Sequence, residues 1–174
     1  AQHPTLTGLV LSIFVAISIS GVYHVLSSRD ENRRHRELME TLVGRVDPVA
    51  SMEDAQEPLD DETKQLTARV DPLVPELEKQ AEKSVLAIKT LIAYASVQIR
   101  MGNYRQAEGV YRAVLKIDPE NVHARRGLGI ALQYLAKYDE AEEIYRRLLK
   151  RSQSVLDPND PEVAIDLNLS LIHI

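Results

Sequence analysis

The sequence contains no cysteine and no tryptophan, and only 5% of its 174 residues are aromatic. Without cysteine there is no disulfide, thiol nucleophile or zinc–thiolate site, and this absence fits reducing and oxidising compartments equally well. The sequence also has only a small excess of charge of one sign. Its 21 Lys and Arg are scattered among 26 Asp and Glu and leave a formal net charge of -5. No basic arm is present to bind phosphates, so a nucleic-acid partner is not expected.

One long uncharged stretch lies near the start of the chain. Residues 6–26, LTGLVLSIFVAISISGVYHVL, contain no Asp, Glu, Lys or Arg. About 20 helical residues span a hydrocarbon core of about 30 Å, so the stretch predicts a single-pass transmembrane helix within residues 1–28. A buried soluble helix and a cleaved secretory signal are the alternatives. A cluster that resembles a stop-transfer flank follows, formed by Arg29, Arg33, Arg34 and Arg36.

The orientation of this predicted span depends on the charges on its two sides. The arginine flank alone would place the downstream residues in the cytoplasm. The chain begins with Ala1 rather than Met, so we expect that processing or truncation has removed the natural N-terminus. Basic residues before Ala1 would reverse the orientation, so the side of the membrane stays open.

Residues 29–75 are predicted to connect the span to the C-terminal half. The first part is charged and has an apolar stripe at helical spacing, which indicates a short helical stalk. The stretch DPVASMEDAQEPLDDET, residues 47–63, is acidic and has no apolar periodicity, which predicts a solvated linker. Helical signals resume over residues 60–70, are interrupted by DPLVP at 71–75 and restart at Glu76.

The C-terminal half repeats itself at an offset of 34 residues, a period typical of tetratricopeptide repeats. The stretch GNYRQAEGVYRAVLKIDPEN, residues 102–121, resembles the second helix and exit turn of such a repeat. The resemblance implies an all-α fold with a helix-turn-helix solenoid over residues 76–168. Its repeats would cover about 88–121 and 122–163, with a partial third from 164 onward. The aligned pairs include Tyr104 with Tyr138, Ala107 with Ala141, Glu108 with Glu142, Tyr111 with Tyr145, Arg112 with Arg146 and Leu115 with Leu149.

The residues at the signature positions of this family are expected to pack the helices together. Small residues let antiparallel helices approach closely, tyrosines fill the gaps between layers, and Asp118-Pro119 ends a hairpin. The predicted repeat-packing residues are Ala95, Gly102, Tyr104, Ala107, Tyr111, Pro119, Leu128, Gly129, Tyr138, Ala141 and Tyr145.

The second repeat has a longer exit, because its turn is delayed to LDPNDPEVA at residues 156–164. The resulting spacing of 42 between Pro119 and Pro161 resembles the longer repeats of the kinesin light chain type. That pattern continues as far as Asn168. The last six residues, LSLIHI at 169–174, resemble the translation of a common sequencing adapter, so we expect a non-native tail. An ordinary apolar end of a helix or strand is the alternative.

No residue pattern in the sequence indicates a catalytic, cofactor or metal site. None of the five histidines pairs with a carboxylate at the i, i+4 spacing of a helical metal site. GLG at 127–129 lies where the repeats need close packing, not after a strand as in phosphate-binding loops. Adjacent acids such as Glu142-Glu143 are splayed on a helix and solvated. We therefore expect no cofactor, no metal and, for the chain as given, no enzyme.

The resemblance implies a concave groove lined by the first helix of each repeat. Lys89 and Arg126, with Arg125 nearby, would receive a carboxylate or an acidic peptide, although the positions depart from the strict carboxylate-clamp pattern. A solvated helix face is the alternative. The predicted groove residues are Lys89, Ile92, Ser96, Ile99, His123, Arg126, Ile130, Gln133 and Asn168.

Two functions follow as hypotheses. The first is a membrane-anchored adaptor or scaffold that binds a protein or peptide partner in its groove, with the acidic linker providing reach. The second hypothesis rests on the order of the segments, an apolar span followed by a charged helix, an acidic stretch and repeats. This order resembles the region after the catalytic domain of bacterial transmembrane serine/threonine protein kinases. The kinase domain would then precede residue 1, and the repeats would be extracytoplasmic. No small-molecule substrate is evident in either case.

Overall fold

The computed structural model describes residues 27–155 and 161–171, which divide after Leu38 into two units. In the first unit, residues 27–38 are helical, and Arg33 lies 3.7 Å from Asp30 and 3.9 Å from Glu37. The predicted transmembrane segment, residues 6–26, lies outside the described residues. Within the described ranges, no helix has both the length and the apolar character needed to cross a membrane.

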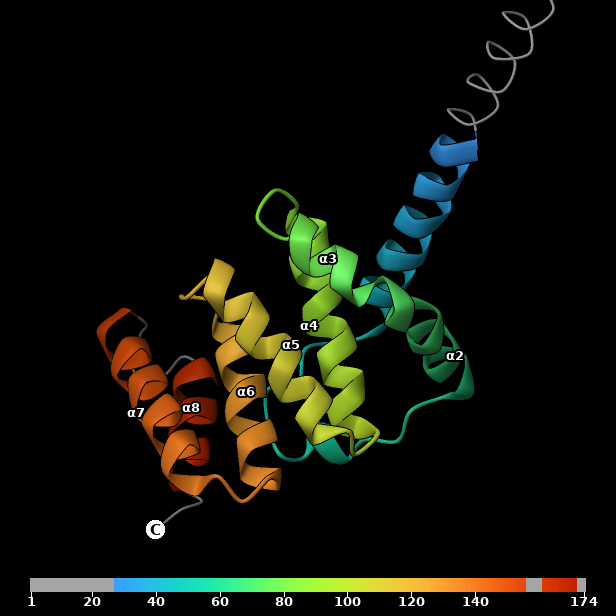
Figure 1. The fold of residues 1–174 in the computed structure, drawn as a ribbon. Helices are drawn as coiled ribbons and strands as arrows, with labels where there is room; N and C mark the ends of the chain where they lie inside the picture. The colour runs from blue at the N-terminus through green and yellow to red at the C-terminus, as the bar shows by residue number, and fades with distance from the viewer. Residues whose placement is uncertain (1–26, 156–160, 172–174) are drawn as a thin grey trace, which may run out of the picture. The chain divides into compact units, whose positions relative to one another are not determined.

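The second unit, from residue 39 onward, is all-α wherever the structure describes it, as the sequence predicts (Figure 1). Residues 39–45 are helical, and residues 46–53 contain only turns and irregular chain. The elements that follow are η1 (Asp54–Gln56), α2 (Asp61–Val70), η2 (Asp71–Leu73), α3 (Val74–Gln80), α4 (Val85–Arg100), α5 (Tyr104–Ile117), α6 (Val122–Tyr134), α7 (Tyr138–Val155) and α8 (Pro161–Leu171).

Helices α4 to α7 form two hairpins that stack side by side, and α8 packs against α7 (Figure 1). Each helix contacts the next one along the chain, and α4 also contacts α6, its equivalent in the second hairpin. This pattern of contacts between neighbours is typical of a solenoid. Helix α8 includes residues 169–171 of the expected non-native tail. Apolar residues extend a helix whatever their origin, so this helix does not test that expectation.

The first helix of each hairpin begins at a polar cap. The Ser84 hydroxyl accepts a hydrogen bond from the Ala87 amide at 3.2 Å, and the Asn121 side chain accepts one from the Ala124 amide at 3.0 Å. Such caps satisfy amides that have no partner inside the helix. Helix α4 therefore starts at Val85, after a break at residues 81–84 that was not predicted from the sequence.

The turns inside the two hairpins share one unusual backbone conformation. Gly102 has φ of +81° between α4 and α5, and Ala136 has φ of +58° between α6 and α7. These residues are 34 positions apart, so the second repeat places a residue with a Cβ where the first has glycine. A left-handed conformation favours glycine, because a Cβ approaches the following carbonyl oxygen there.

The GLG sequence in α6 serves close packing between helices. A Cβ added at Gly127 would overlap the ring of Tyr111 from α5, and one at Gly129 would overlap the ring of Tyr145 from α7. Both tyrosines are completely buried. The two glycines therefore let one tyrosine from each neighbouring helix reach the α6 backbone.

Helices α2 and α3 and the 3-10 turn η2 pack against the first hairpin. The Tyr94 hydroxyl on α4 donates to the Asp71 carboxylate, and the Gln106 amide on α5 donates to the same carboxylate at 3.0 Å. Burial raises the pKa of Tyr94 above its usual value, and the hydrogen bond to Asp71 raises it further. The phenol therefore stays protonated and continues to donate its hydrogen bond at neutral pH.

Part of the acidic stretch predicted as a solvated linker packs against α4. Val49 and Ala55 are buried, as is Val46 just before the stretch, and η1 contacts α4. The carboxylate of Asp54 accepts hydrogen bonds from the amides of Ala50 and Ser51, so this acid closes a local turn. The acids Asp47, Glu53 and Glu57 remain exposed, whereas the apolar residues between them make the tertiary contacts.

Candidate partner-binding site

The nine predicted groove residues separate into two groups by exposure. Lys89, His123 and Asn168 are exposed. The other six are at most 7% exposed and are not available for direct contact with a partner in this conformation. These buried residues are Ile92, Ser96 and Ile99 on α4 and Arg126, Ile130 and Gln133 on α6.

Arg126 was predicted to receive a carboxylate from a partner, and the structure supplies that carboxylate from the chain itself. Its Nε donates to Oδ1 of Asp166 on α8 at 2.7 Å, and the two side chains are only 3% and 2% exposed. The hydroxyl of Ser152 on α7 lies 2.6 Å from the other oxygen of Asp166. The pair is buried between three helices, so Arg126 holds α8 against the second repeat.

We call the face of α4 that carries Ile92, Ser96 and Ile99 its inner side. Ser96, at the centre of this face, makes all its hydrogen bonds within the chain. Its hydroxyl lies 2.9 Å from the Ile92 carbonyl and 3.0 Å from the Tyr111 hydroxyl. The same oxygen accepts a hydrogen bond from the backbone amide of Val49 at 3.1 Å, although the two residues are 47 positions apart. The site predicted for a partner peptide therefore already contains residues of this chain.

Arg100 forms a second contact between α4 and the same stretch of chain. One of its terminal nitrogens lies 3.7 Å from a carboxylate oxygen of Glu57, and its side chain is 11% exposed. Within the described residues, Nε of Arg100 is buried and has no hydrogen-bond partner. The guanidinium therefore forms an ion pair with Glu57, while its Nε lacks a hydrogen bond.

The predicted repeat-packing residues differ in their surroundings. Seven of them are buried, namely Ala95, Ala107, Tyr111, Leu128, Gly129, Ala141 and Tyr145. Tyr104 stacks on Tyr134 with ring centroids 4.4 Å apart and planes 2° apart. Tyr138 is 53% exposed at the equivalent position of the second repeat. Pro119 and Gly102 lie exposed in turns, and Gly129 contacts Tyr145 as described above.

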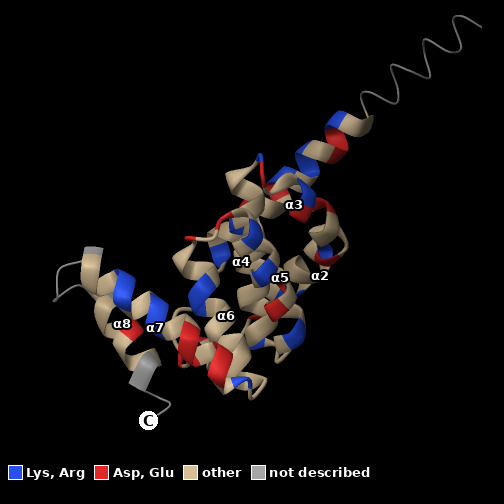
Figure 2. Cartoon of the chain, turned by 60° about the vertical axis from the view of Figure 1, so that its left-hand side comes forward, with Lys and Arg blue, Asp and Glu red and all other residues tan. Residues whose placement is uncertain are grey.

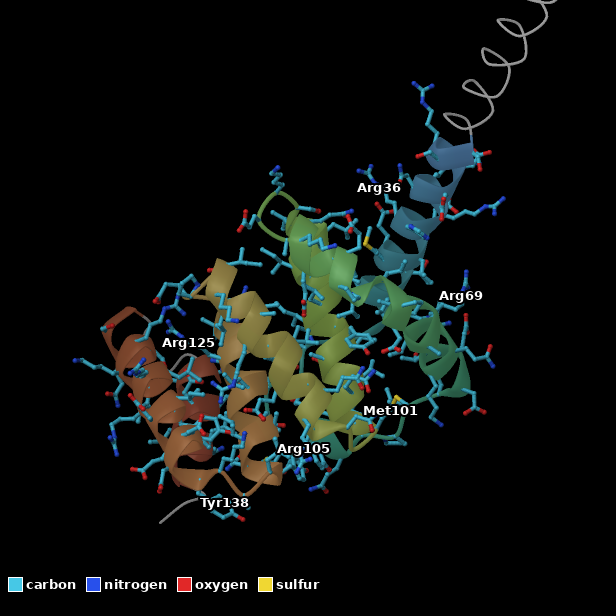
Figure 3. All side chains as sticks on the ribbon, viewed as in Figure 1. Arg36, Arg69, Met101, Arg105, Arg125 and Tyr138 are labelled. Carbon is cyan, nitrogen blue, oxygen red and sulfur yellow. The ribbon has the colours of Figure 1, made fainter. Side chains whose placement is uncertain are left out.

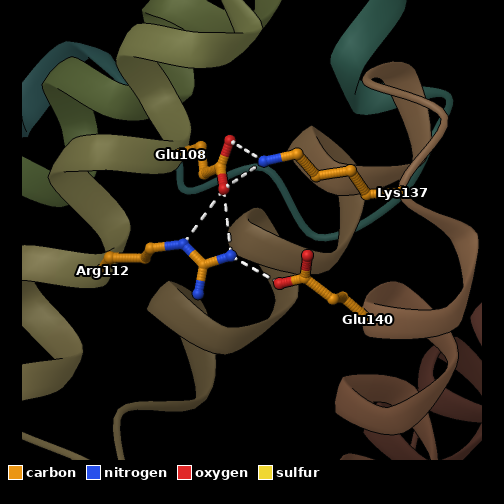
Figure 4. A network of polar contacts seen from close by, with 4 residues as sticks. All are labelled: Glu108, Arg112, Lys137 and Glu140. Atoms are coloured by element: carbon orange, nitrogen blue, oxygen red, sulfur yellow. Dashed lines mark hydrogen bonds and ion pairs between the residues drawn. The ribbon is translucent and has the colours of Figure 1, made fainter.

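A charged network joins the two repeats on their outer side (Figure 4). The carboxylate of Glu108 on α5 accepts from Lys137 at 2.8 Å and from Arg112 at 3.0 Å, and Arg112 also donates to Glu140 on α7 at 2.6 Å. Burial alone would raise the pKa of Glu108, but its hydrogen bonds from Lys137 and Arg112 outweigh that effect and lower the pKa. The network ties α5 to the start of α7.

The rest of the surface formed by residues 27–155 and 161–171 offers no comparable site. Figure 2 shows Lys and Arg interspersed with Asp and Glu along the helices, so charge is not sorted to one face. A hollow at the hairpin turns is lined by residues 102–106 and Leu135. Arg105, one of its lining residues, is labelled in Figure 3. The polar groups of this hollow are partly engaged, because Asn103 donates to Gln98 and Gln106 to Asp71.

Metal coordination is likewise not indicated by the described part of the chain. No group of three or more His, Asp or Glu side chains is placed there to hold a metal ion. The predicted groove, formed by α4 and α6, is therefore the candidate site that the described residues offer.

The sequence contains one signal that the groove prediction overlooked. Between Lys89 and Arg100, α4 has ten consecutive residues without a charge, and all ten are buried. A helix that is uncharged on every side is buried on every side. This run indicates that something covers the inner side of α4, although it does not identify residues 46–57 as the cover.

Comparison with known proteins agrees with this architecture. Residues 98–165, from the end of α4 into α8, match the tetratricopeptide repeat family. No curated protein and no solved structure matches the chain. The family match and the all-helical structure of the described residues together support a tetratricopeptide repeat protein, for which a role in protein–protein interaction is suggested.

Proposed function

We propose that this chain is a membrane-anchored adaptor whose tetratricopeptide repeats bind a protein or peptide partner. The observation that carries this proposal is the stack of two repeat hairpins, α4–α5 and α6–α7, within the stretch that matches the family. Repeats of this kind present an extended surface that recognises another chain. We also propose that the chain as given is not catalytic. The kinase alternative gains no support from the described residues.

The exposed groove positions are where we expect a partner to be nearest. Lys89 near the start of α4 and His123 near the start of α6 are equivalent residues, 34 positions apart, and both are exposed. The six buried groove residues would support the surface from beneath it. Direct contact with them would require the covering parts of the chain to move.

Site-specific photo-crosslinking tests the partner-binding proposal. A photoreactive amino acid at Lys89 or His123 is expected to give one crosslinked product in cells, with the same partner identified by mass spectrometry from both positions. Lys116 on α5 and Lys150 on α7, which are also exposed, are the matched controls and are expected to give no such product. Equal crosslinking from all four positions, or none from any, would exclude the predicted groove as the binding surface.

The membrane anchor is a separate part of the proposal, based on the uncharged stretch 6–26. We expect the full chain to float with membranes in a density gradient and to resist extraction with alkaline carbonate. Aspartate at the centre of a transmembrane helix opposes insertion by about 2.5–3.5 kcal/mol, so Val15→Asp should release the chain. Ser12→Ala is the control and should leave it bound. A native chain that carbonate extracts would contradict the anchor.

A further inference from the structure

We propose that the inner side of α4 is a binding site for an extended, acidic segment of a partner protein, and that residues 46–57 occupy this site until the partner displaces them. We call residues 46–57 the inner segment. The inference rests on the proposed function, because it specifies which kind of partner the repeats accept. It assigns two recognition elements to the site, the Ser96 hydroxyl and the Arg100 guanidinium.

The inner segment lies on α4 in the manner of a bound peptide. Residues 46–50 form neither helix nor strand, and the side chains of Val46 and Val49 are 4% and 1% exposed. One main-chain hydrogen bond, from the Val49 amide to Ser96, fixes the register of this stretch on the helix. Apolar side chains combined with a main-chain hydrogen bond are the usual means of recognising an extended peptide.

The rest of the fold holds α4 in place without the inner segment. Helices α2, α3, α5 and α6 all contact α4. The turn inside the segment is closed by its own residues, because Asp54 accepts from the Ala50 and Ser51 amides. The segment can therefore leave as a unit with its turn intact, while four helices still support α4.

Arg100 shows why a partner would compete successfully with the inner segment. Its Nε is buried without a hydrogen bond among the described residues, and Glu57 approaches another nitrogen of the guanidinium only to 3.7 Å. A carboxylate placed to accept from both nitrogens would form the paired geometry that arginine favours. The inner segment is thus a suboptimal ligand, and a partner acid with better reach would bind more tightly at this position.

The partner is therefore expected to present an extended stretch with a small β-branched side chain followed by a carboxylate. The β-branched side chain would fill the place of Val49, its amide would reach Ser96, and the carboxylate would meet Arg100. The tethered segment competes at an effective concentration of the order of millimolar, so an added peptide binds the native chain weakly. Weakening the tethered segment should open the site.

A peptide in solution tests this exchange without knowledge of the natural partner. The probe is a fluorescent peptide with the sequence of residues 45–58, RVDPVASMEDAQEP, titrated against the full chain in detergent micelles. We expect Val49→Asp in the chain to raise the affinity for the peptide about tenfold or more, because the substitution expels the tethered competitor. Adding Arg100→Gln to that variant should remove part of the gain, because the peptide then loses its ion pair with Arg100.

Two acids of the inner segment provide the matched control. Glu57→Gln in the chain removes the contact with Arg100 and should also increase peptide binding. Glu53→Gln removes an exposed acid that is not in contact with Arg100 and should leave binding unchanged. A folded Val49→Asp chain that binds the peptide no better than the native chain overturns the proposal. Dimerisation of that variant by exchange of segments would instead assign the site to a second copy.

Amide hydrogen exchange of the native chain tests the inference even if the variants fail to fold. The Val49 amide should exchange at least about 100-fold faster than the amides of Ala95 and Val97 in α4, because the segment opens while the helix stays formed. Equal protection of all three would mean that the segment leaves only on global unfolding and would overturn the proposal. Neither measurement uses the natural partner, so failure here is distinguishable from failure of the crosslinking experiment.

Discussion

Helices α4 and α6 occupy equivalent places in the two repeats, yet their inner sides carry different chemistry. Ile92, Ser96 and Ile99 on α4 correspond, 34 residues later, to Arg126, Ile130 and Gln133 on α6. Irregular chain covers the first set through a main-chain hydrogen bond, whereas a helix covers the second through a buried ion pair. The same backbone framework thus accepts a removable cover at one repeat and a fixed one at the other.

The buried tyrosines show how each repeat satisfies its own polar atoms. Tyr111 lies 3.0 Å from the Ser96 hydroxyl, but the position equivalent to Ser96 in the second repeat is Ile130, which has no acceptor. Tyr145 instead donates to the Gln133 side chain at 2.7 Å, one turn further along the helix. A buried hydroxyl needs a partner, so the acceptor has moved while the tyrosine has stayed.

The largest loss of stability is expected where α8 covers the inner side of α6 in the second repeat. Asp166→Ala removes the carboxylate from a buried guanidinium, and breaking such a pair from one side should lower the free energy of unfolding by about 3 kcal/mol. Urea denaturation followed by circular dichroism measures it. Ser96→Ala, at the cover of the first repeat, should cost only about 1 kcal/mol because it loses neutral hydrogen bonds. Equal losses would remove the distinction between the two covers.

A smaller effect is expected where α6 receives the tyrosine of the first repeat. Gly127→Ala places a methyl group against the buried Tyr111 ring, and overpacking of this kind should lower the free energy of unfolding by about 2 kcal/mol. Gly109→Ala in α5 is the control, because nothing lies within 4 Å of its new Cβ. That substitution should stabilise the helix by about 0.5–1 kcal/mol. Stabilisation by both would show that Tyr111 moves aside freely.

The two hairpin turns provide a reciprocal pair of substitutions. Gly102→Ala puts a Cβ on a residue with φ of +81° and should lower the free energy of unfolding by about 1 kcal/mol. Ala136→Gly relieves the same conformation at the second turn. It should be neutral or stabilising by a few tenths of a kcal/mol, because the added freedom of the unfolded chain offsets part of the gain. Thermal melts of both variants measure this, and a destabilising Ala136→Gly would contradict it.

The smallest effect concerns the outer network. Glu108→Gln should lower the free energy of unfolding by about 1 kcal/mol or less at pH 7. The pKa of Glu108 is lower in the folded protein than in the unfolded chain, where it is about 4.3. Its contribution is therefore present above that value and is lost as the pH falls through the folded pKa.

Urea denaturation at pH 7 and near pH 3 tests the sign of this effect. The difference between Glu108→Gln and the native chain should shrink at the lower pH. Glu142→Gln is the equivalent substitution in the second repeat, where the carboxylate pairs with Arg146 on the same helix. This substitution should lower the free energy of unfolding less at pH 7, because the Glu142–Arg146 pair lies within one helix and does not connect two helices. A difference for Glu108 that grows in acid would refute the assignment.

The sequence predicted the repeat and its register, because local periodicity encodes both. Tyr111 and Tyr145 pack equivalently, and the glycines of α6 meet them as the spacing suggests. It did not predict what covers the inner sides of the helices. The contact of Val49 with Ser96 and that of Arg126 with Asp166 join residues 47 and 40 positions apart, and no local pattern specifies such pairings. Charge alone was misleading, since Arg126 was expected to be open to a partner.

The order of the chain gives the inner segment an advantage during synthesis. Residues 46–57 leave the ribosome before α4, so the segment is already tethered nearby when Ser96 and Arg100 first become available. Domains generally fold as units while the N-terminal part emerges first, and closing a loop of this length is fast compared with translation. A newly made chain would therefore complete its folding with its α4 site filled. A partner would gain access by exchange with the segment rather than by reaching an empty site first.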